Sequence, residues 1–378
     1  MKIKLLLVIS LNLILLSFVF RTIYPLHFSP QPLFFSDLIG KPLFLPLWLI
    51  FLSGVGNIIL LFLISQKLFL KKYVLILPLI YNLSFWPDYL IAGGSNYPFL
   101  LFFLLLFGLG YLFFTEQAKK GLILMLVGFF VLIYSSFLML ITLLLLIAGL
   151  NFSPAVAGSK NISKSFVFLL FLLMPLLLLI LINLSAFQNI FQRDIKFFSD
   201  PGLINNTNVF QGEGRDAGLF GLVKISENKY LNLSKEAVNK SIKNILPSTY
   251  FTPQEKLLNF SFTPPIMVGF LIPAFLGLYL VLKNGKQRKY LLLSLILLMP
   301  SFLSKNSLDL NRLLIFFPVI LLLISLGLIN LYENKRKILL GIIIFLVLFQ
   351  LVGTLFDLGS REYPRFERYF IFTNFEIS

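Results

Sequence analysis

The stretch KKYVLILPLIYNLSFWPDYLIAGGSNYPFLLFFLLLFGLGYLFFTEQAKK, residues 71–120, decides how this chain is built. It holds two long apolar runs that are joined by a short segment whose single charge is Asp88, and lysines stand at both ends of the stretch. An apolar run of roughly 20 residues is long enough to cross the hydrocarbon core of a membrane as a helix. The stretch therefore predicts a pair of membrane helices, with Asp88 on one side of the membrane and the lysines on the other.

The composition of the whole chain extends this reading. Hydrophobic residues make up 58% of the 378 residues, charged residues only 13%, and the mean hydropathy is +0.91. Soluble proteins average about 25% charged residues. Because backbone polar groups must be satisfied inside the bilayer, helices are the expected spanning structure. We predict an all-α polytopic membrane protein.

Apolar runs along the chain predict about eleven membrane helices. Residues 121–150 form one apolar run that Tyr134-Ser135-Ser136 interrupts. Thirty residues of helix would measure about 45 Å, which is too long for one crossing, so two short helices that enter and return are expected there. The other nine are expected at 5–20, 42–65, 73–91, 98–114, 166–184, 264–282, 290–303, 313–331 and 338–355.

The positive charges predict the orientation, because lysine and arginine gather on the cytoplasmic side of membrane proteins. With the N-terminus inside, the inner segments hold half of the 32 basic residues but only Glu116 and Glu333 among the 16 acids. The basic residues on this side are Lys2, Lys4, Lys67, Lys71, Lys72, Lys119, Lys120, Lys160, Lys164, Lys283, Lys286, Arg288, Lys289, Lys335, Arg336 and Lys337. The net charge thus reports topology and attraction to anionic membrane lipids rather than nucleic-acid binding.

This orientation divides the chain into four parts in a multi-pass protein of the cell membrane. Residues 1–184 form an N-terminal bundle of seven helices, whose first helix is expected to stay uncleaved because no small-residue cleavage site follows it. Residues 185–263 form an extracytoplasmic loop, and residues 264–355 form the C-terminal membrane helices. The tail, 356–378, is extracytoplasmic, as is the C-terminus.

The long outer segment is expected to fold over the outer mouth of the bundle as a lid. Its first half, FFSDPGLINNTNVFQGEGRDAGLFG at 197–221, is rich in turn-forming residues. There Glu213, Arg215 and Asp216 resemble a ligand-binding turn. The alternative interpretation is a solvated loop. Farther along, apolar spacing predicts a short helix near 233–245.

Three stretches of the chain resemble a known enzyme family. They are ENKYLNLSKEAVNKSIKNILPSTYFT at 227–252 with the apolar run that follows it, DLNRLLIFFPVILLLISLGLINL at 309–331, and the region 77–114. All three are similar to bacterial members of glycosyltransferase family 39, which contains the protein O-mannosyltransferases and is related to the lipid A aminoarabinose transferases. The resemblance implies a helix bundle of the GT-C architecture with one larger outer loop.

The resemblance also implies an activity, namely transfer of a sugar from a polyprenyl-phosphate carrier to an acceptor outside the cytoplasm. Such a reaction needs a carboxylate that orients or deprotonates the acceptor hydroxyl and a cation that holds the lipid phosphate. The residues that match these roles are Asp37 and Asp88 as the carboxylates, Arg312 and Lys305 as the cations, and Asn228, Lys229 and Tyr230 as the family's loop motif. The sugar, the acceptor and any divalent cation stay open.

One departure from the family favours a second interpretation. The family carries an acid, often an Asp-Glu pair, in a substantial first outer loop, whereas this chain has only Asp37 in a short loop and no Asp-Glu pair anywhere. In that case Asp37 neutralises Lys41, Arg312 reaches to the interface, and the protein is a non-catalytic relative in cell-envelope glycan assembly.

Transport and cysteine- or histidine-based chemistry fit the sequence less well. A transporter or flippase of lipid-linked sugars would bury charges at mid-membrane or show related halves, and the sequence shows neither. A chain with no cysteine and one histidine has no thiol catalysis and no histidine-rich metal site, so no metal-binding residues are assigned.

Overall fold

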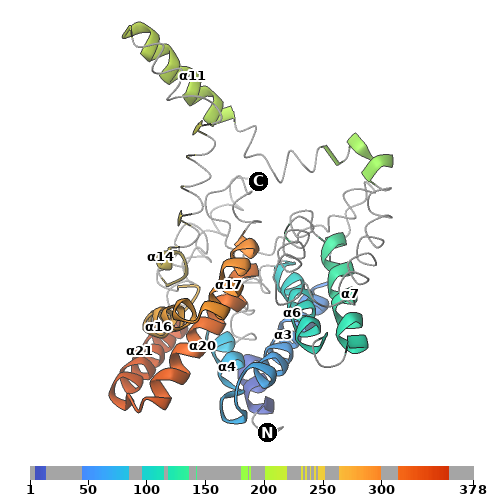
Figure 1. The fold of residues 1–378 in the computed structure, drawn as a ribbon, viewed down its shortest axis with the longest axis vertical. Coiled ribbons are helices and arrows are strands. Elements are labelled where there is room, and N and C mark those ends of the chain that lie inside the picture. The colour runs from blue at the N-terminus through green and yellow to red at the C-terminus, as the bar shows by residue number, and fades with distance from the viewer. Residues whose placement is uncertain are drawn as a thin grey trace, which may run out of the picture.

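A computed structural model gives the fold. It describes residues 5–13, 45–84, 96–114, 118–135, 142, 180–185, 187–188, 201–218, 231–232, 235, 239, 242–243, 246–251, 264–298 and 314–356. Every regular element within these residues is a helix, which confirms the all-α prediction (Figure 1). The main helices are α3 (Leu47–Leu68), α4 (Ile76–Leu83), α6 (Tyr97–Phe114), α7 (Ala118–Ser135), α11 (Pro201–Asp216), α14 (Pro247–Phe251), α16 (Leu271–Lys283), α17 (Gly285–Ser294), α20 (Phe317–Glu333) and α21 (Lys337–Phe356). Single turns of 3-10 helix are η1 (Lys71–Tyr73), η3 (Val268–Phe270), η4 (Leu295–Leu298) and η5 (Leu314–Phe316).

Two of the described helices are long and apolar enough to cross a membrane, at Trp48–Leu68 and Lys337–Leu355. Shorter apolar helices occupy Tyr97–Phe113, Lys120–Leu132, Val268–Lys283 and Phe317–Glu333. Together with the composition, these helices indicate a membrane protein. The predicted total of eleven spans is not confirmed. Of the helix pair expected in 121–150, the structure has the first as α7, and apart from Thr142 the second lies outside the described residues.

The N-terminal helices form one side of the bundle (Figure 1). Helices α3 and α6 run in the same direction, since Asn57 lies next to Pro98 and, farther along both helices, Lys67 lies over the ring of Phe113. Parallel neighbours need a connection that returns across the bundle, and α4 provides it. Helix α7 then packs on α6, where Gly128 lies against the backbone of Phe103. All these directions agree with the alternation that the sequence predicts.

The turn that joins α3 to α4 is fixed to the end of α20. The Tyr73 hydroxyl donates a hydrogen bond to the Glu333 carboxylate at 3.0 Å, and the ring of Tyr73 meets that of Tyr332 edge to face. Lys72 approaches the same carboxylate at 3.8 Å, and its hydrogen bond with Tyr73 raises the pKa of Lys72 above its usual value. The basic segments around Lys72 and Lys335, which the charge pattern places on one face, therefore lie at the same end of the bundle.

Helices α16 and α20 make a close contact, and its direction corrects one prediction. Gly277 of α16 lies against the backbone of Leu323, while Gly327 of α20 lies against Pro273. The earlier residue of α16 meets the later residue of α20, so the two helices run in opposite directions. The predicted topology sends both from the outer to the inner face, and that prediction is wrong for this pair.

The physical reason lies in the segment between these two helices. Helix α17 opens with the polar sequence GKQRKY, which leaves fewer apolar residues in 285–298 than a complete crossing requires. The crossing expected at 290–303 extends beyond the described residues. If the chain returns on the same side after α16, the following helix α20 runs in the opposite direction, as the structure shows.

The outer segment also differs from its prediction. The stretch expected to form turns contains the helix α11, which begins at Pro201 and is followed by Gly218 in the left-handed conformation (φ 74°). Proline is favoured in the first helical turn and glycine just after the last, so both residues bound a helix here instead of breaking one. Glu213, Arg215 and Asp216 are thus exposed helical residues and not a turn.

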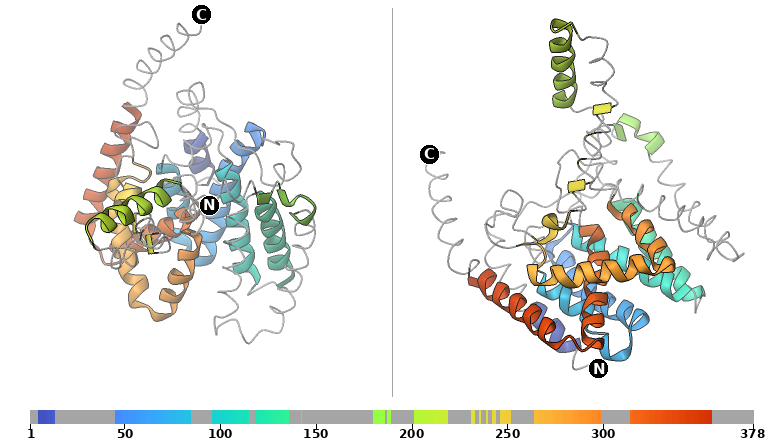
Figure 2. Two further views of the ribbon diagram at one scale, coloured as in Figure 1. Left: turned by 90° about the horizontal axis from the view of Figure 1, so that it is seen from above. Right: turned by 60° about the vertical axis from the view of Figure 1, so that its left-hand side comes forward.

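Helix α11 stands away from the bundle, so it does not cover the outer mouth in this structure (Figure 2). It is linked to the following segment by the hydrogen bond from the Asn232 amide to the Thr207 hydroxyl at 3.0 Å. The described residues between 231 and 243 are all helical, in the region where a short helix is predicted. At the end of the segment, at α14, side chains are buried in the bundle: there Tyr250 and Phe251 join the core, and burial raises the pKa of Tyr250. Near its start, Phe187 is partly buried against the same core.

Candidate functional site

The residues predicted to act in catalysis and binding lie outside the described residues. They are Asp37, Asp88, Asn228, Lys229, Tyr230, Lys305 and Arg312. The structure nevertheless describes the chain on both sides of Asp88 and directly after Arg312. These flanking residues are buried and hydrogen-bonded, and they show how the two segments are anchored.

A buried polar cluster anchors both ends of the segment that carries Asp88. Asn57, in the middle of α3 and 0% exposed, donates one hydrogen bond to the Tyr81 hydroxyl at 3.2 Å and one to the Pro98 carbonyl at 3.1 Å. Tyr81 precedes the segment 85–95, and Pro98 follows it. One amide on a third helix therefore fixes the distance between the two ends of this segment.

The last turn of α4 is held by two further side chains. Asn82 donates a hydrogen bond to the Val8 carbonyl of the N-terminal helix at 2.7 Å, and the Ser84 hydroxyl donates to the Ile80 carbonyl at 2.9 Å. Both side chains are almost wholly buried. The end of α4, the last described part of the chain before Asp88, is thus firmly anchored in the bundle.

The described residues that follow Arg312 pack beside this point. Ile315 and Phe317, which follow Arg312, are fully buried, and the ring of Phe317 meets that of Tyr81 with 6.0 Å between the centroids. Tyr81 therefore contacts both Asn57 and Phe317. The described residues that flank Asp88 and those that follow Arg312 lie side by side.

Several amide oxygens at this end of the bundle lack a hydrogen-bond partner among the described residues. They are the Oδ1 atoms of Asn57, Asn82 and Asn96, and all three side chains are at least nine-tenths buried. A buried acceptor without a donor is costly, so an incoming donor would be bound favourably. These three residues are not among the site residues predicted from the sequence. Their signal was present, because each is an isolated amide next to or within an apolar run, and polar residues inside membrane helices are commonly functional.

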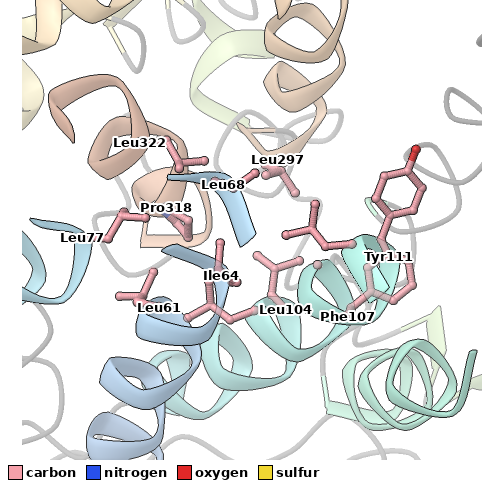
Figure 3. Close-up of a pocket in the computed structure, with 13 residues that line it drawn as sticks. Leu61, Ile64, Leu68, Leu77, Leu104, Phe107, Tyr111, Leu297, Pro318 and Leu322 are labelled. Atoms are coloured by element: carbon pink, nitrogen blue, oxygen red, sulfur yellow. The ribbon is translucent and has the colours of Figure 1, made fainter. Parts of the chain in front are cut away.

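A second feature is an apolar cavity of about 350 Å³ between α3, α4, α6, η4 and α20 (Figure 3). Leu61, Ile64 and Leu68 form its wall on α3, and Leu104 and Phe107 contribute from α6. Its lining is almost entirely hydrocarbon, in contrast to the amide cluster. The two features therefore suit different ligands.

The described residues hold no cluster of three or more His, Cys, Asp or Glu side chains of the kind that binds a metal ion.

Comparison with known proteins found similarity to solved structures but none to a protein-family model or a curated protein. Among solved structures, the chain is similar to the crystal structure of the oligosaccharyltransferase of Archaeoglobus fulgidus in its apo form, with a TM-score of 0.43 and 14% sequence identity. The match covers 85% of this chain and 44% of that one, so this chain spans less than half the length of that protein.

Proposed function

We propose that this protein is a membrane glycosyltransferase that moves a sugar from a polyprenyl-phosphate carrier to an acceptor on the extracytoplasmic side. The observation that carries the proposal is the contact between Tyr81 and Phe317, together with the hydrogen bond from Asn57 to Tyr81. These contacts hold the chain next to Asp88 and the chain after Arg312 at one end of the bundle. A carboxylate and a guanidinium that start from neighbouring anchors can share one cavity.

In the proposed reaction the acceptor hydroxyl attacks the anomeric carbon of the carrier-bound sugar. A new bond to that carbon forms, the bond from the carbon to the phosphate oxygen breaks, and polyprenyl phosphate leaves. Asp37 takes the proton of the acceptor hydroxyl, with Asp88 as a supporting carboxylate. Arg312, with Lys305, binds the phosphate by charge-assisted hydrogen bonds.

The buried amides fit the sugar in this scheme. The Oδ1 atoms of Asn57, Asn82 and Asn96 are acceptors, and sugar hydroxyl groups are donors. Asn228, Lys229 and Tyr230 belong to the outer segment and are proposed to contact the same ligand from outside the bundle.

Purified protein tests this proposal when it is incubated with a panel of polyprenyl-phosphate sugars and the released lipid phosphate is measured. We expect the wild type to release lipid phosphate and Asp37→Asn to release none. Arg312→Ala should have a higher KM for the carrier. Asp88→Asn is expected to reduce turnover without weakening carrier binding. Unchanged release by Asp37→Asn would remove Asp37 from the mechanism.

The second candidate is a non-catalytic partner in cell-envelope glycan assembly, which the absence of an Asp-Glu pair from the sequence favours. It predicts carrier binding without release of lipid phosphate for every sugar in the panel. Carrier binding by Arg312→Ala is then measured in the same way. Weaker binding than in the wild type would show that Arg312 contributes to a phosphate site even without catalysis. Transport of the lipid-linked sugar is the third outcome, seen as transfer of the intact carrier across a vesicle membrane.

A further inference from the structure

The apolar cavity deepens along α3 away from Lys67. Leu61 is 2% exposed, Ile64 is 8% exposed, and Leu68, which lies next to Lys67, is 44% exposed. All three line the cavity on one face of the helix. The cavity is therefore closed near the middle of α3 and opens at the last turn, beside Lys67.

The mouth of the cavity carries positive charge. Lys67 lies 4.7 Å from the centre of the Phe113 ring, so its ammonium group sits between the last turns of α3 and α6. Leu68 and Leu112, the sequence neighbours of these two residues, belong to the cavity wall. Lys71 is exposed on the turn that follows α3. A hydrocarbon interior with lysines at its entrance matches a molecule with an apolar chain and an anionic head.

Neither water nor empty space suits this interior. An apolar cavity offers water no hydrogen-bond partners and stays dry, and its wall loses dispersion contacts when nothing fills it. In a bilayer the abundant apolar filler is a lipid acyl chain. The lysine-rich ends of membrane helices attract anionic lipids.

We propose that this cavity binds one acyl chain of an anionic membrane phospholipid, whose phosphate-bearing headgroup contacts Lys67. The site differs from the carrier site proposed above. On α3 the carrier site is placed near the middle, at Asn57, whereas this cavity opens at the last turn. The bound lipid joins five separate parts of the bundle, namely α3, α4, α6, η4 and α20, and thereby stabilises the fold.

Gly108 provides a direct test, because it lines the cavity and a Cβ atom added there would meet no heavy atom within 4 Å. Gly108→Leu therefore fills the cavity from a helix that tolerates the change. Gly341→Leu is the matched control, since Gly341 on α21 also has open space and lies away from the cavity. Lys67→Gln tests the mouth, with Lys120→Gln on α7 as its control.

The full-length protein is delipidated in detergent. Its melting temperature is then measured after either dioleoyl phosphatidylglycerol or dioleoyl phosphatidylcholine is added. Native mass spectrometry counts the lipids that remain bound. We expect phosphatidylglycerol to raise the melting temperature of the wild type, Gly341→Leu and Lys120→Gln by several degrees more than phosphatidylcholine does. Gly108→Leu should melt at or above the wild-type temperature without lipid and gain little from either lipid. Lys67→Gln should respond equally to both.

Three results overturn the proposal. The first is a full phosphatidylglycerol response in Gly108→Leu, and the second is an equal response of the wild type to both lipids. The third is stabilisation by polyprenyl phosphate alone, which would assign the cavity to the carrier. Failure of the transferase assay leaves all these outcomes unaffected, because none of them measures sugar transfer.

Discussion

Asn57 and Tyr81 join α3 to α4 through a hydrogen bond of 3.2 Å between two side chains that are almost completely shielded from solvent. The same amide also reaches the Pro98 carbonyl at the start of α6. Three helices are thus connected by one polar side chain in an apolar bundle. Because nothing apolar can satisfy these groups, the contact favours one arrangement of the three helices over shifted alternatives.

The first prediction concerns the strength of this connection. In a double-mutant cycle of Asn57→Leu and Tyr81→Phe, we expect a coupling energy of about 0.6 kcal/mol and at most about 1.7 kcal/mol, the average and the maximum found for hydrogen bonds between membrane helices. Asn57→Leu alone should cost more than Tyr81→Phe, because it also leaves the Pro98 carbonyl without a donor. Unfolding of the detergent-solubilised protein measures both. Strictly additive effects would show that the two side chains do not interact.

The contact between α16 and α20 supports a second prediction. Alanine at Gly277 or Gly327 would press a methyl group against the backbone of the partner helix, so each substitution should destabilise the protein by about 1–3 kcal/mol. Gly341→Ala, where the added Cβ has open space, is the control and should be neutral or stabilising by up to about 1 kcal/mol. Thermal unfolding of the three variants compares them. Equal melting temperatures would mean that the two helices separate easily.

The third prediction concerns the turn before α4. Tyr73→Phe removes a hydrogen bond from a buried tyrosine to the Glu333 carboxylate, and we expect a loss of stability on the order of 1 kcal/mol. Lys72→Gln should have a smaller effect, since its ion pair with Glu333 is exposed and screened by salt. Melting temperatures at low and high salt distinguish the two contacts. A larger loss in Lys72→Gln would reverse the assignment.

Apolar length located several of the described helices from the sequence alone. The predicted spans 42–65 and 98–114 correspond to α3 and α6, and 313–331 and 338–355 correspond to α20 and α21, with bounds that differ by a few residues. These runs are unambiguous because burial of an apolar helix in the membrane depends on composition and length, both of which are local properties of the sequence.

The direction of α16 and the structure of 201–216 depend on other information. The relative direction of two membrane helices depends on how many times the chain crosses the membrane between them. The start of α17 is so polar that the sequence does not fix this number for α16 and α20. Residues 201–216 were assigned to turns from their Pro, Gly and Asn content, although Pro201 and Gly218 are placed as helix boundaries. The candidate site was also only partly predictable from the sequence. Its predicted acids lie outside the described residues, and a single amide next to or within an apolar run, as at Asn57 and Asn82, is only a weak sequence signal of function.

The last prediction tests the direction of α16 in the membrane. The charge pattern places Lys283 and Lys335 on one face, whereas the structure places Lys283 past Gly277 at one end of the α16–α20 pair and Lys335 past Glu333 at the other. At a rise of 1.5 Å per residue, the two lysines lie about 27 Å apart along the helix axes, close to the thickness of the hydrocarbon core. The chain has no cysteine, so Lys283→Cys and Lys335→Cys each introduce a single thiol for labelling. In sealed vesicles a membrane-impermeant maleimide should label only one of the two variants, and detergent should expose the other. Labelling of both variants from the same side would restore the topology predicted from charge and contradict the antiparallel contact between α16 and α20.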